Sequence, residues 1–223
     1  MIKVVLFDLD DTLISEDEYI RSGYRHIAEV LEEKYRLKNQ AAVQELYRLY
    51  KESAKNVFNR FLDVHGIHYE VDDIKYLVNE YRSHTPHISY YDDVPETVQK
   101  LKDKGVRVGV ITDGYLITQK KKAEAIQLQT MFEKIIFTDE LGRDYWKPST
   151  KSFEMMKKYF GVEYREMAYV GDNPQKDFYV KKSLPIKTIR IVRPISVYSD
   201  SDYLEGVKED VRIENLSAIL HAI

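Results

Sequence analysis

The chain opens with a short, nearly continuous apolar run, Ile2–Phe7, which predicts a buried β-strand. After Leu13-Ile14, apolar residues recur at every third or fourth position, a spacing typical of amphipathic helices. No strand is predicted between Ser15 and His84, so this stretch should form an all-helical module. Its helices are indicated by Ile20, Tyr24, Ile27, Leu31 and Tyr35, by a longer run from Val43 to Leu62 that ends near His65-Gly66, and by Ile74, Leu77, Val78 and Tyr81.

Beyond Tyr91 the pattern alternates between strand and helix. Strands are predicted at Val106–Ile111, Lys134–Phe137, Met167–Val170, Lys187–Val192 and Val211–Ile213, and helices at Tyr115–Leu128 and Pro148–Tyr159. Such alternation implies right-handed crossovers and a parallel sheet. We therefore predict an α/β fold with a doubly wound, Rossmann-like parallel sheet. Residues 1–14 and 88–223 would form this core, and residues 15–87 would form the inserted helical module.

Composition narrows the classes of function. The 223 residues carry a formal net charge of -3 and include no cysteine. Without a basic excess, neither nucleic acid nor an anionic membrane is expected as a partner. The lack of cysteine excludes disulfides and thiolate metal sites. No leader-like N-terminus and no membrane-length apolar stretch is present, so a cytoplasmic protein is expected. The oligomeric state stays open.

Two carboxylates follow the opening strand directly, in Asp8-Leu9-Asp10-Asp11-Thr12. Because side chains alternate along an extended backbone, Asp8 and Asp10 should point the same way. Like charges at such close range need a proton or a cation between them. The carboxyl ends of strands in open α/β sheets are also where ligands bind. The sequence therefore predicts the functional site at this strand end.

Other predicted strand ends and one helix start bring further polar groups to the same edge. They are Thr112-Asp113-Gly114, Lys147 before Pro148, and Gly171-Asp172-Asn173 with Asp177. Clustered carboxylates suit Mg²⁺, which keeps waters and substrate phosphate oxygens as ligands. A hydroxyl, an ammonium and turn amides suit the other phosphate oxygens. A carboxylate beside such a phosphate can act as a nucleophile and form an aspartyl phosphate.

Taken in order, these segments resemble the four motifs of the haloacid dehalogenase superfamily. The matching segments are Asp8–Thr12, Ile111–Gly114, Lys147-Pro148 and Gly171–Asp177. The resemblance covers essentially the whole predicted core, and the helical module resembles the cap that this family inserts between its first and second motifs. It implies a Mg²⁺-dependent hydrolase of the phosphatase type, acting on a small phosphate ester.

The resemblance also implies a role for each matching residue. In chain order these are Asp8 as nucleophile and metal ligand, Asp10 as metal ligand through its backbone carbonyl and as general acid and base through its side chain, Thr112, Asp113 and Lys147 as the phosphate-binding group, Asp172 as metal ligand, and Asn173 and Asp177 as residues that support the ligands.

The same residues bear on four other possible functions. A dehalogenase is disfavoured because a halide leaves without a proton, which would make an acid at Asp10 superfluous. A phosphomutase of the same superfamily needs the same residues and stays open beside the phosphatase. A signalling receiver would carry its phosphate acceptor on a middle strand of the chain, not on the first. An inactive phosphate-binding module would not need the complete set of catalytic residues.

Overall fold

The computed structural model describes residues 1–37, 39–196, 198 and 201–223. The chain divides into two compact units: Met1–Glu16 with Ser89–Ile223, here the core unit, and Asp17–Ile88, here the helical unit. The elements are β1 (Val4–Phe7), α1 (Glu16–Tyr35), α2 (Asn39–Glu52), α3 (Val57–Val64), α4 (Val71–Ser83), α5 (Val94–Asp103), β2 (Arg107–Thr112), α6 (Leu116–Ala125), α7 (Leu128–Met131), β3 (Lys134–Phe137), α8 (Lys151–Phe160), β4 (Met167–Gly171), β5 (Lys187–Ile191), β6 (Val211–Ile213) and α9 (Ile219–Ala222).

The strands of the core unit form one parallel sheet in the order β3-β2-β1-β4-β5-β6. On β1, Leu6 is in register with Gly109 of β2 on one side and with Tyr169 of β4 on the other. The chain first builds the sheet outward on one side of β1 and then crosses to the other side. The predicted doubly wound parallel sheet is thereby confirmed, and the strand order reverses at β1, where such sheets bind their ligands.

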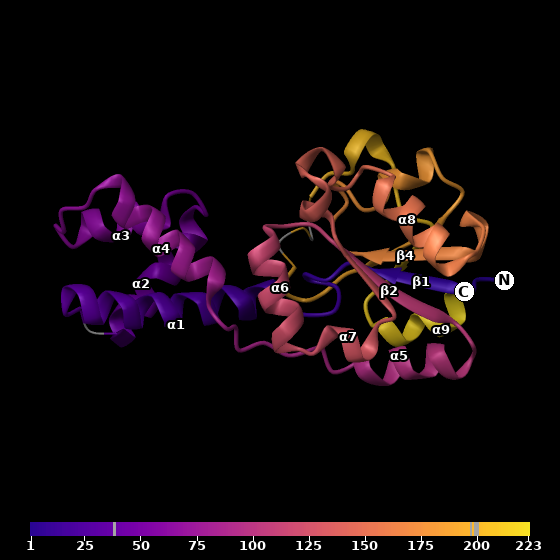
Figure 1. Ribbon diagram of the computed structural model, residues 1–223, viewed down its shortest axis with the longest axis horizontal. Coiled ribbons are helices and arrows are strands. Elements are labelled where there is room, and N and C mark those ends of the chain that lie inside the picture. The colour runs from indigo at the N-terminus through magenta and orange to yellow at the C-terminus, as the bar shows by residue number, and fades with distance from the viewer. Residues whose placement is uncertain (38, 197, 199–200) are drawn as a thin grey trace. The chain divides into compact units, whose positions relative to one another are not determined.

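Helices cover both faces of this sheet (Figure 1). On one face, α8 contributes Phe153, Met156 and Phe160 to a cluster that includes Leu6 of β1. On the other face lie α5, α7 and α9, and there the ring of Phe7 meets the ring of Phe132 edge-on, with centroids 5.7 Å apart. Because both faces are covered, β1 is apolar at every position, as parallel strands usually are.

A tight turn after β1 leads the chain out of the core unit. The carbonyl of Leu9 accepts hydrogen bonds from the backbone N–H groups of Leu13 (2.9 Å) and Ile14 (3.2 Å). Ile14 then forms an antiparallel bridge with Tyr90, and the N–H of Tyr91 donates to the carbonyl of Leu13 at 3.0 Å. The outgoing and returning segments of the chain therefore lie side by side.

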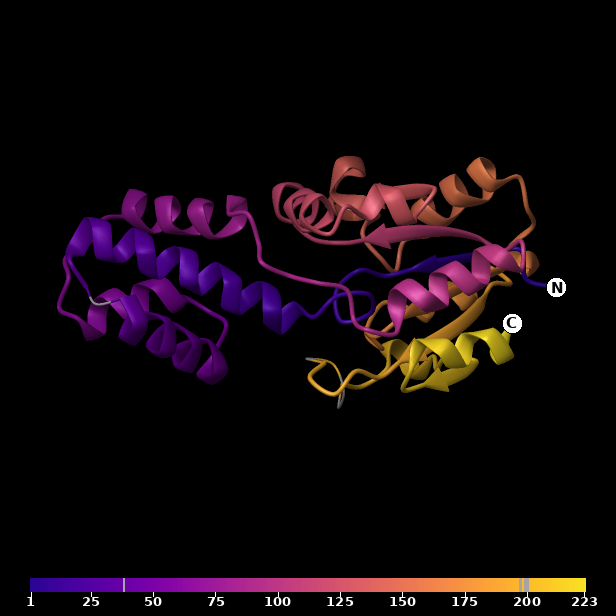
Figure 2. The same cartoon turned by 90° about the horizontal axis from the view of Figure 1, so that it is seen from below.

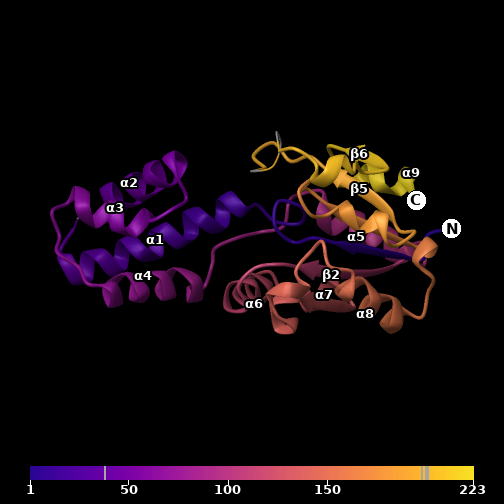
Figure 3. The ribbon, with the colours of Figure 1, turned by 90° about the horizontal axis from the view of Figure 1, so that it is seen from above.

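The helical unit is built around α1, with α4 running alongside it (Figure 2 and Figure 3). Lys34 pairs with Asp73 at 2.5 Å and His26 with Glu80 at 2.9 Å, so the two helices are antiparallel. Its apolar core is drawn from all four helices and consists of Tyr19, Ile20, Tyr24, Ile27, Ala28, Leu31, Ala42, Leu46, Leu49, Val57, Phe58, Phe61, Leu62 and Leu77. The expected all-helical insertion is confirmed for the described residues.

Three local expectations were wrong or incomplete. The long helix predicted from Val43 to Leu62 is interrupted between α2 and α3, where Arg60 donates to the carbonyl of Leu49, in the last turn of α2, and to that of Ser53, just beyond it. The helix predicted from Pro148 starts later, as α8, because a turn closed by Ser149 N–H on Trp146 precedes it. Helix α5 was not predicted. Within the described residues, no helix is both long and apolar enough to cross a membrane.

Candidate active site

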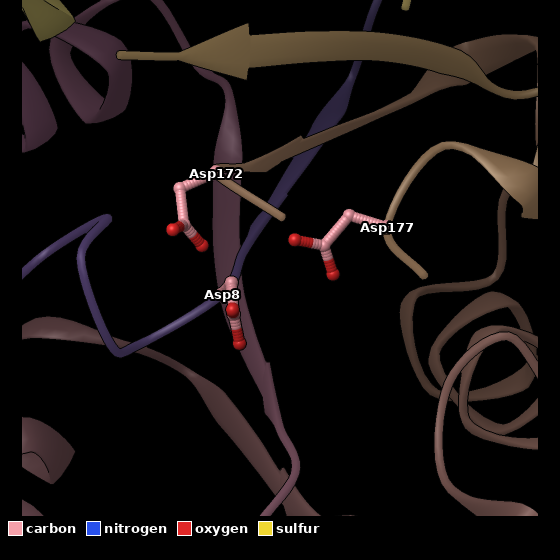
Figure 4. Close-up of side chains that lie close together, drawn as sticks. All are labelled: Asp8, Asp172 and Asp177. Atoms are coloured by element: carbon pink, nitrogen blue, oxygen red, sulfur yellow. The ribbon is translucent and has the colours of Figure 1, made fainter. Parts of the chain in front are cut away.

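Three aspartates converge at the carboxyl ends of β1 and β4 (Figure 4). Asp8 follows β1, Asp172 follows β4, and Asp177 lies in the turn beyond it; each can place a carboxylate oxygen within 4.8 Å of the others. All three side chains are buried. The structure thus brings together residues that are distant in sequence, and their donor set is one that could hold a metal ion.

Burial and mutual repulsion act on this cluster. Burial raises the pKa of Asp8 to about 6, with Asp177 adding to the shift and Lys147 opposing it. Burial, together with Asp177 and Asp8, raises the pKa of Asp172 well above its usual range. Three carboxylates in so small a buried space cannot all be ionised unless positive charge lies among them. The cluster therefore favours a bound cation.

One lysine already supplies part of that positive charge. The ammonium of Lys147 lies 2.8 Å from a carboxylate oxygen of Asp8 and 2.8 Å from one of Asp177. It also donates to the hydroxyl of Tyr169, at 2.6 Å, which in turn donates to Asp177 at 3.2 Å. Although burial acts in the opposite direction, Asp177 and Asp8 raise the pKa of Lys147 well above its ordinary value. Lys147 is therefore a buried, permanently charged group at the centre of the site.

The turn after β4 holds Asp177 in place. Its carboxylate accepts a hydrogen bond from the backbone N–H of Asn173 at 2.9 Å. A Cβ atom at Gly171 would lie 2.5 Å from the Asp177 carboxylate, so only glycine fits there. The side chain of Asn173 is engaged within the turn, where it accepts from the N–H of Gln175. Of the two residues predicted to support the ligands, Asp177 joins the carboxylate cluster and Asn173 shapes the backbone.

The Thr112-Asp113 pair ends β2 beside β1, as expected from the parallel sheet. Asp113 accepts from the hydroxyl of Thr138 at 2.7 Å and from the N–H of Lys147 at 3.2 Å, and it pairs with Lys176 at 3.0 Å. Despite its burial, the neighbouring Lys147 and Lys176 lower the pKa of Asp113. The carboxylate of Asp113 is therefore committed to protein donors, and only its backbone and the Thr112 hydroxyl remain suited to an anion.

Asp10 belongs to a separate network. Its carboxylate pairs with the ammonium of Lys122 at 2.7 Å and accepts from the side-chain amide of Gln119 at 2.7 Å. Lys122 also pairs with Glu16. Although burial opposes the shift, Lys122 lowers the pKa of Asp10, whereas burial raises the pKa of Glu16 to about 8 against the effect of Lys122. The side chain of Asp10 is thus directed to helix α6, apart from the carboxylate cluster.

Sequence reasoning missed several groups of this site. Lys122 and Gln119 on α6, Tyr169 on β4, Lys176, and Ser196, whose hydroxyl donates to Asp172 at 2.9 Å, were not singled out. For α6 a signal existed, because its inward positions are polar where an amphipathic helix would carry apolar residues. Tyr169 gave no such signal, since a tyrosine within a buried strand reads as core.

Comparison with protein families places this chain. Residues 5–191 match the model of a family described as haloacid dehalogenase-like hydrolase. That match runs from within β1 to the end of β5 and includes the helical unit.

Two relatives and one solved structure show the range of the similarity. The glyceraldehyde 3-phosphate phosphatase of Methanocaldococcus jannaschii is 29% identical over 198 residues, which cover 86% of this chain and 86% of that protein. The pyrophosphatase PpaX of Bacillus cereus is 26% identical over 224 residues, covering 98% and 95% of the two chains. The HAD-hydrolase YfnB of Bacillus subtilis, solved bound to magnesium, aligns with a TM-score of 0.71 at 19% identity over 99% of this chain and 98% of that one. At this identity the last comparison concerns the fold alone.

Proposed function

Because the chain belongs to the haloacid dehalogenase-like hydrolases, we propose that it is a Mg²⁺-dependent phosphatase that hydrolyses a small phosphorylated metabolite through an aspartyl phosphate. The observation that supports this most directly is the buried cluster of Asp8, Asp172 and Asp177 with the Lys147 ammonium beside it. Relatives that are named as phosphatases match this chain over most of their length, and this similarity also supports the proposal.

The donor set suits the proposed cation. The side chains that would bind the cation all offer carboxylate oxygens, which Mg²⁺ prefers. The raised pKa values of Asp8 and Asp172 show that their charged forms would be stabilised by further positive charge. Asp8, Asp172 and the backbone carbonyl of Asp10 would hold Mg²⁺, with Asp177 supporting them. Bound there, Mg²⁺ would neutralise charge on the phosphate oxygens and orient the ester.

The first step transfers the phosphoryl group to the protein. A carboxylate oxygen of Asp8 attacks phosphorus, and the bond from phosphorus to the ester oxygen breaks. The negative charge of the bound phosphate favours the protonated form of the Asp10 carboxyl, against the effect of Lys122 on its pKa. Asp10 then donates its proton to the ester oxygen, so that the alcohol leaves neutral. Thr112 and Lys147 contact the other phosphoryl oxygens with a hydroxyl and an ammonium, the donors that best match the charge on the group in transfer.

The second step releases phosphate. Water attacks phosphorus while Asp10, now a carboxylate, accepts its proton, and the bond between phosphorus and the Asp8 oxygen breaks. Asp8 and Asp10 return to their starting states, so the cycle balances. Because Asp8 is buried, nucleophiles too large to enter the site cannot attack the phosphoryl group bound to it.

The test is a panel of phosphate esters, with release of inorganic phosphate as the readout. The panel includes glyceraldehyde 3-phosphate and inorganic pyrophosphate, because relatives carry those names. Turnover should require Mg²⁺ and vanish after chelation and dialysis, and Ca²⁺ should inhibit because its looser coordination disturbs in-line geometry. Full turnover of the chelated protein would contradict the metal assignment.

A matched control separates the site from the rest of the surface. Asp172→Asn should remove activity, whereas Asp103→Asn, an exposed aspartate on α5, should not. The phosphomutase alternative predicts a different product, since a second hydroxyl in place of water would take the phosphoryl group. Isomerised sugar phosphate without release of inorganic phosphate, followed by ³¹P NMR, would favour the mutase.

A further inference from the structure

Helix α6 buries polar residues where a helix on a sheet normally buries apolar ones. Gln119 and Lys122, three positions apart and so on one side of the helix, are 1% and 2% exposed. Lysine is almost never buried unless it is paired, because an isolated ammonium loses its favourable hydration when it leaves water. Neither residue belongs to any of the four motifs. Their burial therefore calls for a partner that needs them.

That partner is the Asp10 carboxylate, and each of its oxygens has its own donor. Lys122 Nζ lies 2.7 Å from Oδ1, and Gln119 Nε2 lies 2.7 Å from Oδ2. With one donor on each oxygen, rotation of the carboxylate about its Cβ–Cγ bond would break at least one contact. The two α6 side chains thus fix the direction as well as the place of the carboxylate.

The same amide ties Asp10 to the phosphate-binding turn. Gln119 Nε2 is also 2.7 Å from the Thr112 hydroxyl oxygen and 2.7 Å from the Asp113 carbonyl, so its two hydrogens are shared among three acceptors. Gly114 has a φ of 129°, and a Cβ atom there would lie 3.1 Å from the Gln119 side chain. Glycine at this position therefore leaves room for Gln119 to reach both strand ends.

Lys122 and the carboxylate that it holds differ in their exposure to solvent. The Lys122 side chain is 2% exposed, whereas those of Asp10 and Glu16 are 27% and 29% exposed. Water cannot compete for Lys122, but Asp10 keeps an accessible surface. This is the arrangement that a proton-transferring group requires: fixed from the protein side and open toward a reactant.

We propose that Lys122 and Gln119 are positioning residues that orient the Asp10 carboxylate for proton transfer to the leaving oxygen of the ester. The inference rests on the proposed function and extends it to residues outside the motifs. Neither residue touches the reacting atoms. The proton moves from Asp10 to the ester oxygen as the phosphorus–oxygen bond breaks, and Lys122 and Gln119 act only through Asp10.

The test compares two esters that differ in their need for an acid. Phenyl phosphate has a poor leaving group that must be protonated, whereas 2,4-dinitrophenyl phosphate releases a stable anion. The readout is kcat/KM, because it covers the steps up to formation of the phosphorylated Asp8. Lys122→Met and Gln119→Met should each lower kcat/KM about 10- to 100-fold more for phenyl phosphate than for the dinitrophenyl ester. Equal losses with both esters would overturn the inference.

The matched control is Lys121→Met, on the same helix one position earlier. Lys121 pairs with Glu124 at the surface, at 3.2 Å, and its replacement should leave the ratio of the two kcat/KM values as in the unaltered protein. A second check combines Lys122→Met with Asp10→Asn. If Lys122 acts through Asp10, the double variant should lose little more than Asp10→Asn alone, whereas independent losses would reject the proposed route.

Folding of the variants is followed by circular dichroism and thermal unfolding. Lys122→Met leaves Asp10 and Glu16 without their shared ammonium, so Lys122→Met with Glu16→Gln is made in parallel. If both of these variants fail to fold, the kcat/KM comparison of the two esters with Gln119→Met decides the question. This substitution removes a neutral hydrogen-bond donor and replaces it with a side chain of similar size. Absence of Mg²⁺-dependent hydrolysis of the dinitrophenyl ester by the unaltered protein would reject the proposed function, and the inference with it. Intact hydrolysis with equal losses rejects the inference alone.

Discussion

The two units of the chain bury different kinds of side chain. Among the described residues, the buried polar side chains of the helical unit are Ser22 and His84, and the rest of its interior is aliphatic and aromatic. The interior of the core unit also holds charged groups, including Asp8, Asp11, Asp113, Lys122, Lys147, Asp172, Asp177, Arg190 and Arg193. Both units have an apolar core, but among the described residues the buried carboxylates, lysines and arginines all lie in the core unit.

This difference separates stability from chemistry. Apolar burial stabilises a fold by roughly 25 cal/mol per Å². A buried ion pair contributes little or opposes folding, because desolvation offsets the attraction between the charges. The charges of the core unit therefore point to chemistry, and the apolar interior of the helical unit points to stability. Substitutions in the two units should accordingly change different observables.

The largest effect is expected from Asp8→Asn. An amide cannot attack phosphorus, so turnover should fall by more than about 10⁴-fold. Thermal stability of the metal-free protein should not fall, because the change removes a carboxylate whose charged form burial disfavours. Phosphate release and thermal unfolding are the measurements. A large loss of stability with retained turnover would contradict the view that the buried charges of the core unit serve chemistry and not stability.

Asp10→Asn should have the next largest effect. It removes both proton transfers but leaves the backbone carbonyl in place, so turnover should fall roughly 10²–10⁴-fold. With an activated ester the first step should recover, and the phosphorylated protein should accumulate. Intact-mass and peptide analysis should then locate one phosphate on Asp8. A phosphate found on another residue would show that the roles of Asp8 and Asp10 are wrongly assigned.

Leu46→Ala tests the helical unit. Leu46 is fully buried in α2, and removing its side chain should destabilise the protein by about 2–5 kcal/mol. Urea unfolding measures this change, with Val64→Ala as the control because Val64 is 61% exposed. Turnover of a small activated ester per folded molecule should stay near that of the unaltered protein. A marked loss of turnover per folded molecule would show that the interior of the helical unit also contributes to catalysis.

The smallest effect concerns pH and one polar contact of the helical unit. Although burial opposes it, the hydroxyl of Tyr47 and the guanidinium of Arg21 lower the pKa of Asp17 below its ordinary value. A depressed carboxyl pKa stabilises the fold above the unfolded pKa, near 3.9, and this contribution is lost as pH falls through the folded value. Tyr47→Phe should therefore flatten the dependence of urea stability on pH between about 5 and 2. Tyr76→Phe, at an exposed ring on α4, is the control and should leave the dependence unchanged.

The motifs were readable in sequence because they obey local rules. A polar residue directly after a buried strand lies at the edge of the sheet whatever the rest of the chain does, and this is why Asp8, Thr112 and Asp172 could be selected. The break between α2 and α3 was not readable. Apolar periodicity continues across the gap, and the contact of Arg60 with the Leu49 carbonyl in the last turn of α2 exists only in the folded chain.

The sequence alone determined the α/β class, the helical insertion and the strand ends that carry the carboxylates, since each follows from spacing over a few residues. Only the tertiary structure decided how those groups pair. It joined Lys147 to Asp8 and Asp177, gave Asp10 to Lys122 and Gln119, and turned the Asp113 carboxylate toward protein donors. These contacts link positions up to 139 residues apart, as between Lys147 and Asp8. Burial and distance between such positions depend on the assembled sheet and not on any local pattern.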